Sequence, residues 1–140
     1  MDIGRRRIGV VLNLLSLFLF LVFYYAGRAL GWDRLLLIGG VSVCLAVWLV
    51  SFITVHVRTG LWKFVHTRVD DLDERQAQVA HEALRYSYAT FTVICLLIMF
   101  FNATTGYRGH YMFDAILPAS LLYVAHILPS SVLAWREKEV

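Results

Sequence analysis

The sequence predicts an all-α integral membrane protein with four transmembrane helices in two antiparallel hairpins, a cytoplasmic interfacial helix and an extended third helix. Of its 140 residues, 59% are hydrophobic and only 16% are charged, which is too little charge to cover a soluble domain of this length. The hydrophobic residues gather in four runs, each near the roughly 20 residues that a helix needs to cross a bilayer. We therefore expect one compact membrane domain over residues 1–140.

The first predicted span covers about residues 8–26 and follows three consecutive arginines at positions 5–7. Its apolar run is longer than the roughly 7–15 residues of a signal-peptide core, so we interpret it as a retained span. Only Asn13 and Ser16 interrupt the run, and we expect Asn13 to hydrogen-bond to another helix. A short turn over residues 27–34 follows, so the second span must return beside the first.

The second predicted span covers about residues 35–57 and carries small residues, which let helix backbones approach closely. These small residues are Gly39, Gly40, Ser42, Cys44 and Ala46. After the span, Gly60 marks a bend into a short amphipathic segment. Leu61, Trp62 and Val65 share one face of that segment, which predicts a helix in the headgroup layer with its basic residues facing anionic lipid.

The third predicted helix runs over residues 68–101, half in water and half in the bilayer, with its span at about residues 86–103. Asp70 or Asp71 is expected to cap its start. The spacing of Asp71 and Glu74 fits a capping box, in which the second acid reaches back to the amide of the cap residue. The cytoplasmic loop then comprises residues 58–85, including the first turns of this helix.

The fourth predicted span covers about residues 111–135 and contains Pro118 and Pro129. Proline lacks the N–H that would bond four residues back, so we expect both prolines to kink the helix. Ser130 and Ser131 are candidates to satisfy the freed carbonyl groups.

The distribution of basic residues predicts the orientation, because cytoplasmic loops carry an excess of Lys and Arg. Ten basic residues fall on one side of the predicted spans and three on the other. This places both termini and the loop over residues 58–85 on the cytoplasmic side of a bacterial-type inner membrane. The net charge of +3 comes from these flanking residues, so we expect no nucleic-acid partner.

Three ionisable residues are candidates for chemistry inside the membrane. Asp114 is an acid within a predicted span, which makes it the candidate ion or proton site of an alternative function as a small transporter or channel. His126 and His56 are the candidate ligands of a second alternative, a haem- or pigment-binding subunit. His126 also lies one turn from Tyr123, which favours a hydrogen-bonded pair in the interior. We interpret the acids at positions 70–74 as a helix cap and not as metal ligands. The sequence predicts no metal site and no resident cofactor.

The segment Leu72-Asp73-Glu74-Arg75-Gln76, followed by Ala80, Arg85 and an apolar span, resembles a motif found in known proteins. It is similar to the Asp-Glu-Arg motif that opens the third helix in a group of small, uncharacterised bacterial four-span membrane proteins. That resemblance implies a layout of paired hairpins with an acidic start to a cytoplasmic helix. It also implies an accessory or regulatory role rather than a reaction.

The leading functional hypothesis is a non-enzymatic accessory, assembly or regulatory subunit of a membrane complex. It would dock partners through its cytoplasmic loop and its lipid-facing helices, so the expected partners are membrane lipids and other membrane-protein subunits, with homo-oligomers left open. The candidate partner-binding residues are Trp62, Phe64, Asp73, Glu74, Arg75 and Arg85.

Overall fold

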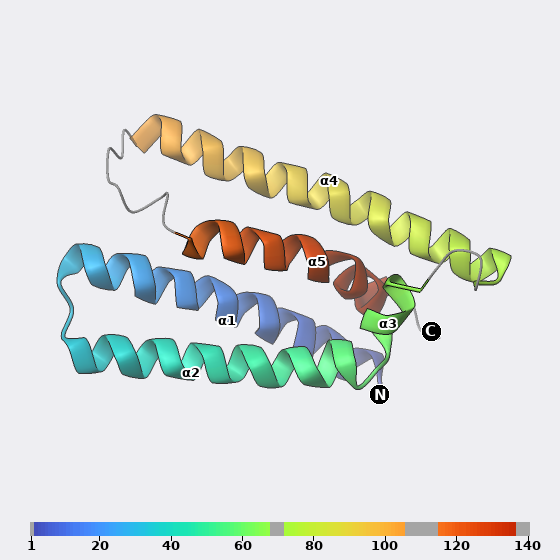
Figure 1. The fold of residues 1–140 in the computed structure, drawn as a ribbon, viewed down its shortest axis with the longest axis horizontal. Helices are drawn as coiled ribbons and strands as arrows, with labels where there is room; N and C mark the ends of the chain where they lie inside the picture. Colours follow the sequence, from blue (N-terminus) through green and yellow to red (C-terminus); the bar gives the residue numbers. More distant parts are fainter. Residues whose placement is uncertain (1, 68–71, 106–114, 137–140) are drawn as a thin grey trace.

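The computed structural model describes residues 2–67, 72–105 and 115–136, and the side chains of residues 102–105 are excepted. Within these ranges the chain is all-helical (Figure 1). Its elements are α1 (Ile3–Leu30), α2 (Arg34–Phe52), η1 (Ile53–Val57), α3 (Leu61–Val65), α4 (Glu74–Thr105) and α5 (Ile116–Arg136). Four helical segments are long and apolar enough to cross a membrane, with α2 and η1 forming one of them. The predicted helical class and the number of candidate spans are confirmed.

Helix α5 is the central helix of the bundle. It lies between α4 on one side and α1 and α2 on the other, and α3 covers one end (Figure 1). In the most apolar stretch of α5, 39% of the residues are buried inside the protein. In the corresponding stretch of α4, only 6% are buried. Helix α4 is therefore the least enclosed of the four, and most residues of its apolar stretch are exposed.

The turn between α1 and α2 is shorter than the predicted segment 27–34. Helix α1 continues through Gly27 to Leu30. Gly31 caps its end with a φ of 64°, the left-handed conformation that glycine adopts without strain. The amides of Gly31 and Trp32 both bond to the Gly27 carbonyl oxygen. Asp33 then caps α2, because its side chain accepts a hydrogen bond from the Leu35 amide at 3.0 Å. Three residues suffice to connect the two helices.

Helix α1 packs against α2 and η1 where glycines leave room for large side chains. Gly9 faces Val55, Gly27 faces Leu37, and Gly40 faces Phe23. A Cβ at Gly27 would lie 2.8 Å from Cδ2 of Leu37, which is too close for two carbon atoms. Of the predicted small residues, Gly40 lies at a helix contact and Cys44 is buried. Gly39 faces open space, and Ser42 and Ala46 are exposed.

Helix α2 continues into one π-helical turn, η1, which the sequence did not predict. The Arg58 amide bonds to the carbonyl of Ile53, five residues back, at 2.9 Å. The Thr54 hydroxyl donates to the Val50 carbonyl at 2.8 Å, so it bonds the backbone just before the wide turn. Adjacent residues Val55 and His56 are both buried, with 1% and 0% exposure.

Helix α3 is a five-residue helix that is docked on the bundle. Gly60 precedes it with a φ of 76°, which confirms the predicted bend at this glycine. Leu61 is 1% exposed and belongs to the hydrophobic core. That core consists of Val10, Val55, Leu61, Ala83, Leu133 and Ala134. The predicted apolar face of this segment therefore packs partly against protein.

Helix α4 is one continuous helix of 32 residues, which confirms the extended third helix, but its cap differs from the prediction. The Asp73 side chain accepts a hydrogen bond from the Gln76 amide at 2.7 Å, and the Gln76 side chain accepts one from the Asp73 amide at 3.2 Å. This is a capping box in which glutamine replaces the usual acid. The predicted box of Asp71 and Glu74 is wrong, because Glu74 is the first residue of the helix. Asp70 and Asp71 lie outside the described residues.

Helix α5 begins at Ile116, and Ala115 before it is a turn residue, so the predicted start near residue 111 is wrong. Pro118 is the third residue of the helix, and the N–H groups of the first turn have no hydrogen-bond acceptor within a helix. The missing N–H of Pro118 therefore breaks no bond, and the expected kink there is wrong. Pro129 lies inside the helix. The hydroxyls of Ser130 and Ser131 both donate to the Ile127 carbonyl, and not to the carbonyl that Pro129 frees four residues back.

Candidate functional site

A buried hydrogen-bond network joins α1, α2 and α5 near the middle of the bundle. Asn13, which is 0% exposed, donates from Nδ2 to the Trp48 carbonyl and to the Ser51 hydroxyl, each at 3.0 Å. Tyr123 donates its hydroxyl proton to Oδ1 of Asn13 at 2.8 Å. The predicted interhelical role of Asn13 is confirmed, and both ends of its amide are used. We call Asn13, Ser51 and Tyr123 the central network.

A second buried polar pair links η1 to α5. His56 Nδ1 lies 2.9 Å from the hydroxyl oxygen of Ser130, which also donates to the Ile127 carbonyl at 2.9 Å. A hydroxyl has one proton, so when it is given to Ile127 the imidazole N–H of His56 must be the donor to Ser130. His56 Nε2 is buried and has no hydrogen-bond partner among the described residues. Both residues are 0% exposed, so the pair is enclosed in the interior.

The two histidines predicted as a ligand pair lie in different environments. His126 is exposed, and its Nδ1 lies 2.8 Å from the Leu122 carbonyl oxygen on the same helix. His56 is enclosed and bonded to Ser130. The expected hydrogen-bonded pair of His126 and Tyr123 is wrong, because the Tyr123 hydroxyl donates to Asn13.

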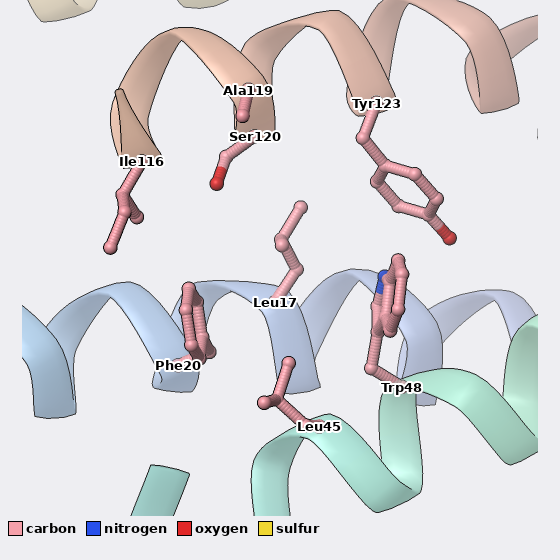
Figure 2. A pocket seen from close by; sticks show the side chains of 8 residues that line it. All are labelled: Leu17, Phe20, Leu45, Trp48, Ile116, Ala119, Ser120 and Tyr123. Atoms are coloured by element: carbon pink, nitrogen blue, oxygen red, sulfur yellow. The ribbon is translucent and has the colours of Figure 1, made fainter. Parts of the chain in front are cut away.

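An apolar crevice of about 270 Å³ lies beside the central network, between α1, α2 and α5 (Figure 2). Its lining consists of Leu17, Phe20, Leu45, Trp48, Ile116, Ala119, Ser120 and Tyr123. The rings of Trp48 and Tyr123 meet edge to face with centroids 4.9 Å apart. None of these eight side chains carries a charge at neutral pH. The crevice can hold an apolar group, and it offers no acid–base pair.

Four of the six candidate partner-binding residues lie at the beginning of α4. Asp73, Glu74, Arg75 and Arg85 are all exposed there. Exposed charge of both signs over three helical turns is suited to polar contacts with another protein.

The other two candidates, Trp62 and Phe64 of α3, are half-buried. Phe64 packs against the hydrophobic core. Trp62 stacks on His66 with centroids 4.3 Å apart and meets Phe52 edge to face at 5.8 Å. These two side chains therefore contribute to the attachment of α3 as well as to its surface.

The remaining sequence candidates give no site in the described part of the chain. Asp114 lies outside the described residues. Cys44 and Cys95 are free thiols, the first buried and the second half-buried. Within the described residues, no three His, Cys, Asp or Glu side chains are grouped as a metal would require.

Sequence reasoning missed the contacts that close the bundle at its α3 end. Arg7 donates from Nε and Nη2 to the Trp135 carbonyl at 3.1 and 2.9 Å, so the first turns of α1 meet the last turn of α5. The Arg136 guanidinium lies 4.3 Å from the Tyr86 ring centroid on α4. Interfacial Arg, Trp and Tyr are visible in the sequence, but which of them pair across the chain is not.

Comparison with protein-family models, curated proteins and solved structures gave no match.

Proposed function

We propose that the protein is a multi-pass protein of a bacterial-type inner membrane, with its four spans in two antiparallel hairpins and both termini in the cytoplasm. Four apolar helices support the membrane placement. The contact between Arg7 and Trp135 supports a common side for the first turn of α1 and the last turn of α5. The excess of basic residues on that side supports the cytoplasmic assignment.

Labelling of introduced cysteines tests this topology. Gln78→Cys and Arg34→Cys are made in a chain whose two native cysteines are alanine, and a membrane-impermeant maleimide is added to intact cells or to inverted vesicles. We expect residue 78 to react only in inverted vesicles and residue 34 only in cells. Reaction of residue 78 in intact cells would refute the orientation.

Within that membrane, the protein acts as a non-enzymatic accessory, assembly or regulatory subunit that docks a partner protein through α3 and the beginning of α4. The observation that carries this function is the projection of α4: its amino-terminal turns extend past the ends of α1, α2 and α5 (Figure 1). Glu74 and Arg75 in the first turn of α4 are exposed, and Arg85 is exposed farther along the helix, two residues after the core residue Ala83. A charged helix start that extends past the bundle is accessible to a partner without rearrangement of the fold.

The buried polar groups of the bundle fit a structural role within such a subunit. Asn13 and Tyr123 bond to each other, and His56 bonds to Ser130, so these groups hold helices together. The charged groups at the beginning of α4 are exposed and are not used in this interior bonding. The proposed function therefore assigns helix assembly to the interior and partner binding to the projecting end.

Site-specific photo-crosslinking in the native membrane tests the docking. A photoreactive residue replaces Gln78 on the exposed start of α4, and the same residue at Arg34, at the beginning of α2, is the control. We expect one cross-linked species of constant mass from residue 78 and none from residue 34. The double variant Arg75→Glu and Arg85→Glu should abolish the cross-linked species that forms from residue 78.

The docking proposal fails if no cross-linked species forms from any exposed position between residues 74 and 85 while the protein is correctly inserted. It also fails if the species persists unchanged in the charge-reversed variant. A species whose mass is a multiple of the chain's own mass identifies a second copy as the partner.

A further inference from the structure

A crevice of about 340 Å³ opens at the end of the bundle where α1, α4 and α5 meet, separate from the crevice beside the central network. It is lined by Val10, Tyr86, Thr90, Ser131, Val132, Trp135 and Arg136. This volume falls within the range of small-molecule sites, which is roughly 300–1,000 Å³. Its walls are mainly apolar and aromatic, whereas its mouth carries a guanidinium group.

Arg136 is positively charged, and no carboxylate of the described residues forms an ion pair with it. Its guanidinium lies over the Tyr86 ring, 4.3 Å from the centroid, which fixes its position without using any of its five N–H donors. Among the described residues it has no ion pair and no hydrogen bond. An arginine held in this way presents a planar set of donors that matches a phosphate group.

Arg7 adds a second positive charge beside the crevice. Two of its donors bond to the Trp135 carbonyl, and its guanidinium carbon lies 5.2 Å from the centroid of the Trp135 ring. The end of α5 would otherwise repel an anion, because unsatisfied carbonyls give a helix C-terminus partial negative charge. Arg7 offsets that charge, so the Arg136 guanidinium stays available for a ligand.

We propose that this crevice binds one anionic phospholipid, with the phosphate on Arg136 beside Arg7 and an acyl chain between α1, α4 and α5. The apolar walls directly behind the guanidinium favour a lipid over free phosphate, which would leave them empty. Arg7 and Arg136 have no acidic partner within residues 2–67, 72–105 and 115–136, which favours an anionic headgroup over a zwitterionic one. Basic pockets between transmembrane helices recognise lipid headgroups in this way. The inference rests on the proposed membrane placement but not on the docking of a partner protein.

Native mass spectrometry of the purified, delipidated protein tests this site. Phosphatidylglycerol and phosphatidylcholine with the same acyl chains are added in separate titrations. We expect the first phosphatidylglycerol to bind more tightly than phosphatidylcholine. Arg136→Gln should weaken that first binding about fivefold, which corresponds to ~1 kcal/mol per basic side chain at an anionic surface. Arg34→Gln removes the same charge at the opposite end of the bundle and should leave the affinity unchanged.

A second pair of variants tests the apolar half of the site. Thr90→Trp fills the crevice without a change of charge, and it should reduce phosphatidylglycerol binding at least as much as Arg136→Gln. Thr92→Trp makes the same substitution on exposed α4 surface outside the crevice and should have no effect. Both threonines are exposed, so neither variant disturbs the core.

Three results would overturn the proposal. Equal affinity for the two lipids excludes an anionic headgroup site. Equal loss in Arg136→Gln and Arg34→Gln indicates general charge attraction, and displacement of the lipid by millimolar inorganic phosphate indicates a phosphate site without an acyl-chain site. Because the experiment uses the purified chain alone, these results are independent of whether a partner protein docks on α4.

Discussion

Tyr123 of α5 donates its hydroxyl proton to Oδ1 of Asn13 on α1 over 2.8 Å, although 110 positions separate the two residues in the chain. The other end of the same amide bonds to the Trp48 carbonyl and the Ser51 hydroxyl of α2. Three helices thus share one buried side chain. In an apolar environment such bonds hold helices in register, because each broken bond leaves a polar group without water to solvate it.

Asn13→Leu should destabilise the protein by about 2 kcal/mol, since it removes three interhelical hydrogen bonds of about 0.6 kcal/mol each. The free energy of unfolding is measured by titration with SDS in mixed micelles. Ser16→Ala is the control, because the buried Ser16 hydroxyl bonds only to the Asn13 carbonyl of its own helix. If the two variants lose the same stability, the central network does not hold the helices together.

Ser130→Ala should destabilise the protein by about 1–3 kcal/mol, because it leaves Nδ1 of the enclosed His56 without a partner. Ser131→Ala is the control variant. Ser131 is also buried on α5, but among the described residues its side chain bonds only to the Ile127 carbonyl of its own helix. The free energies of unfolding of the two variants are compared by the same SDS titration. A double variant with His56→Phe should cost less than the sum of the single changes. Additive losses would show that His56 and Ser130 are not coupled.

Gly9→Ala should destabilise the protein by about 1–3 kcal/mol, because the new methyl group would clash with Cγ2 of Val55, a core side chain. Gly39→Ala is the control, since a Cβ there meets nothing within 4 Å and alanine favours the helix. We expect the control to be neutral or slightly stabilising in the same assay. A destabilised Gly39→Ala together with a neutral Gly9→Ala would contradict the observed contact between α1 and η1.

Asp73→Ala should fray the start of α4 at a cost of about 1 kcal/mol, because Asp73 satisfies the amide of Gln76. Hydrogen exchange of the amides of residues 74–77 should accelerate, and the remainder of α4 should exchange as before. Gln76→Ala removes the reciprocal bond and should have a smaller effect in the same direction. Unchanged exchange in Asp73→Ala would place the cap elsewhere, as the sequence prediction of a cap at Asp71 did.

The errors of the sequence prediction have a common physical origin. The sequence allows two capping boxes, Asp71 with Glu74 and Asp73 with Gln76, and only the position of the first helical turn selects the second. Pro118 was expected to kink a span, but it lies in the first turn of α5, so the position of the helix start decides its effect. Likewise, the π-turn before Arg58 occurs beside a hydroxyl–carbonyl bond of Thr54 and the buried His56, and neither feature has a periodic pattern. Periodicity locates a helix more reliably than it locates the ends of that helix.

The sequence by itself determined the helical class, the four apolar segments and the continuity of the third helix, and it indicated that Asn13 needs an interhelical polar partner. It could do so because hydrophobic run length and the absence of Gly or Pro are local properties of the chain. Only the tertiary structure decided that Asn13 meets Tyr123, that His56 meets Ser130, and that Arg7 and Arg136 lie beside one crevice. Several partners were chemically equivalent for each of these groups, and the choice among them depends on how the helices pack.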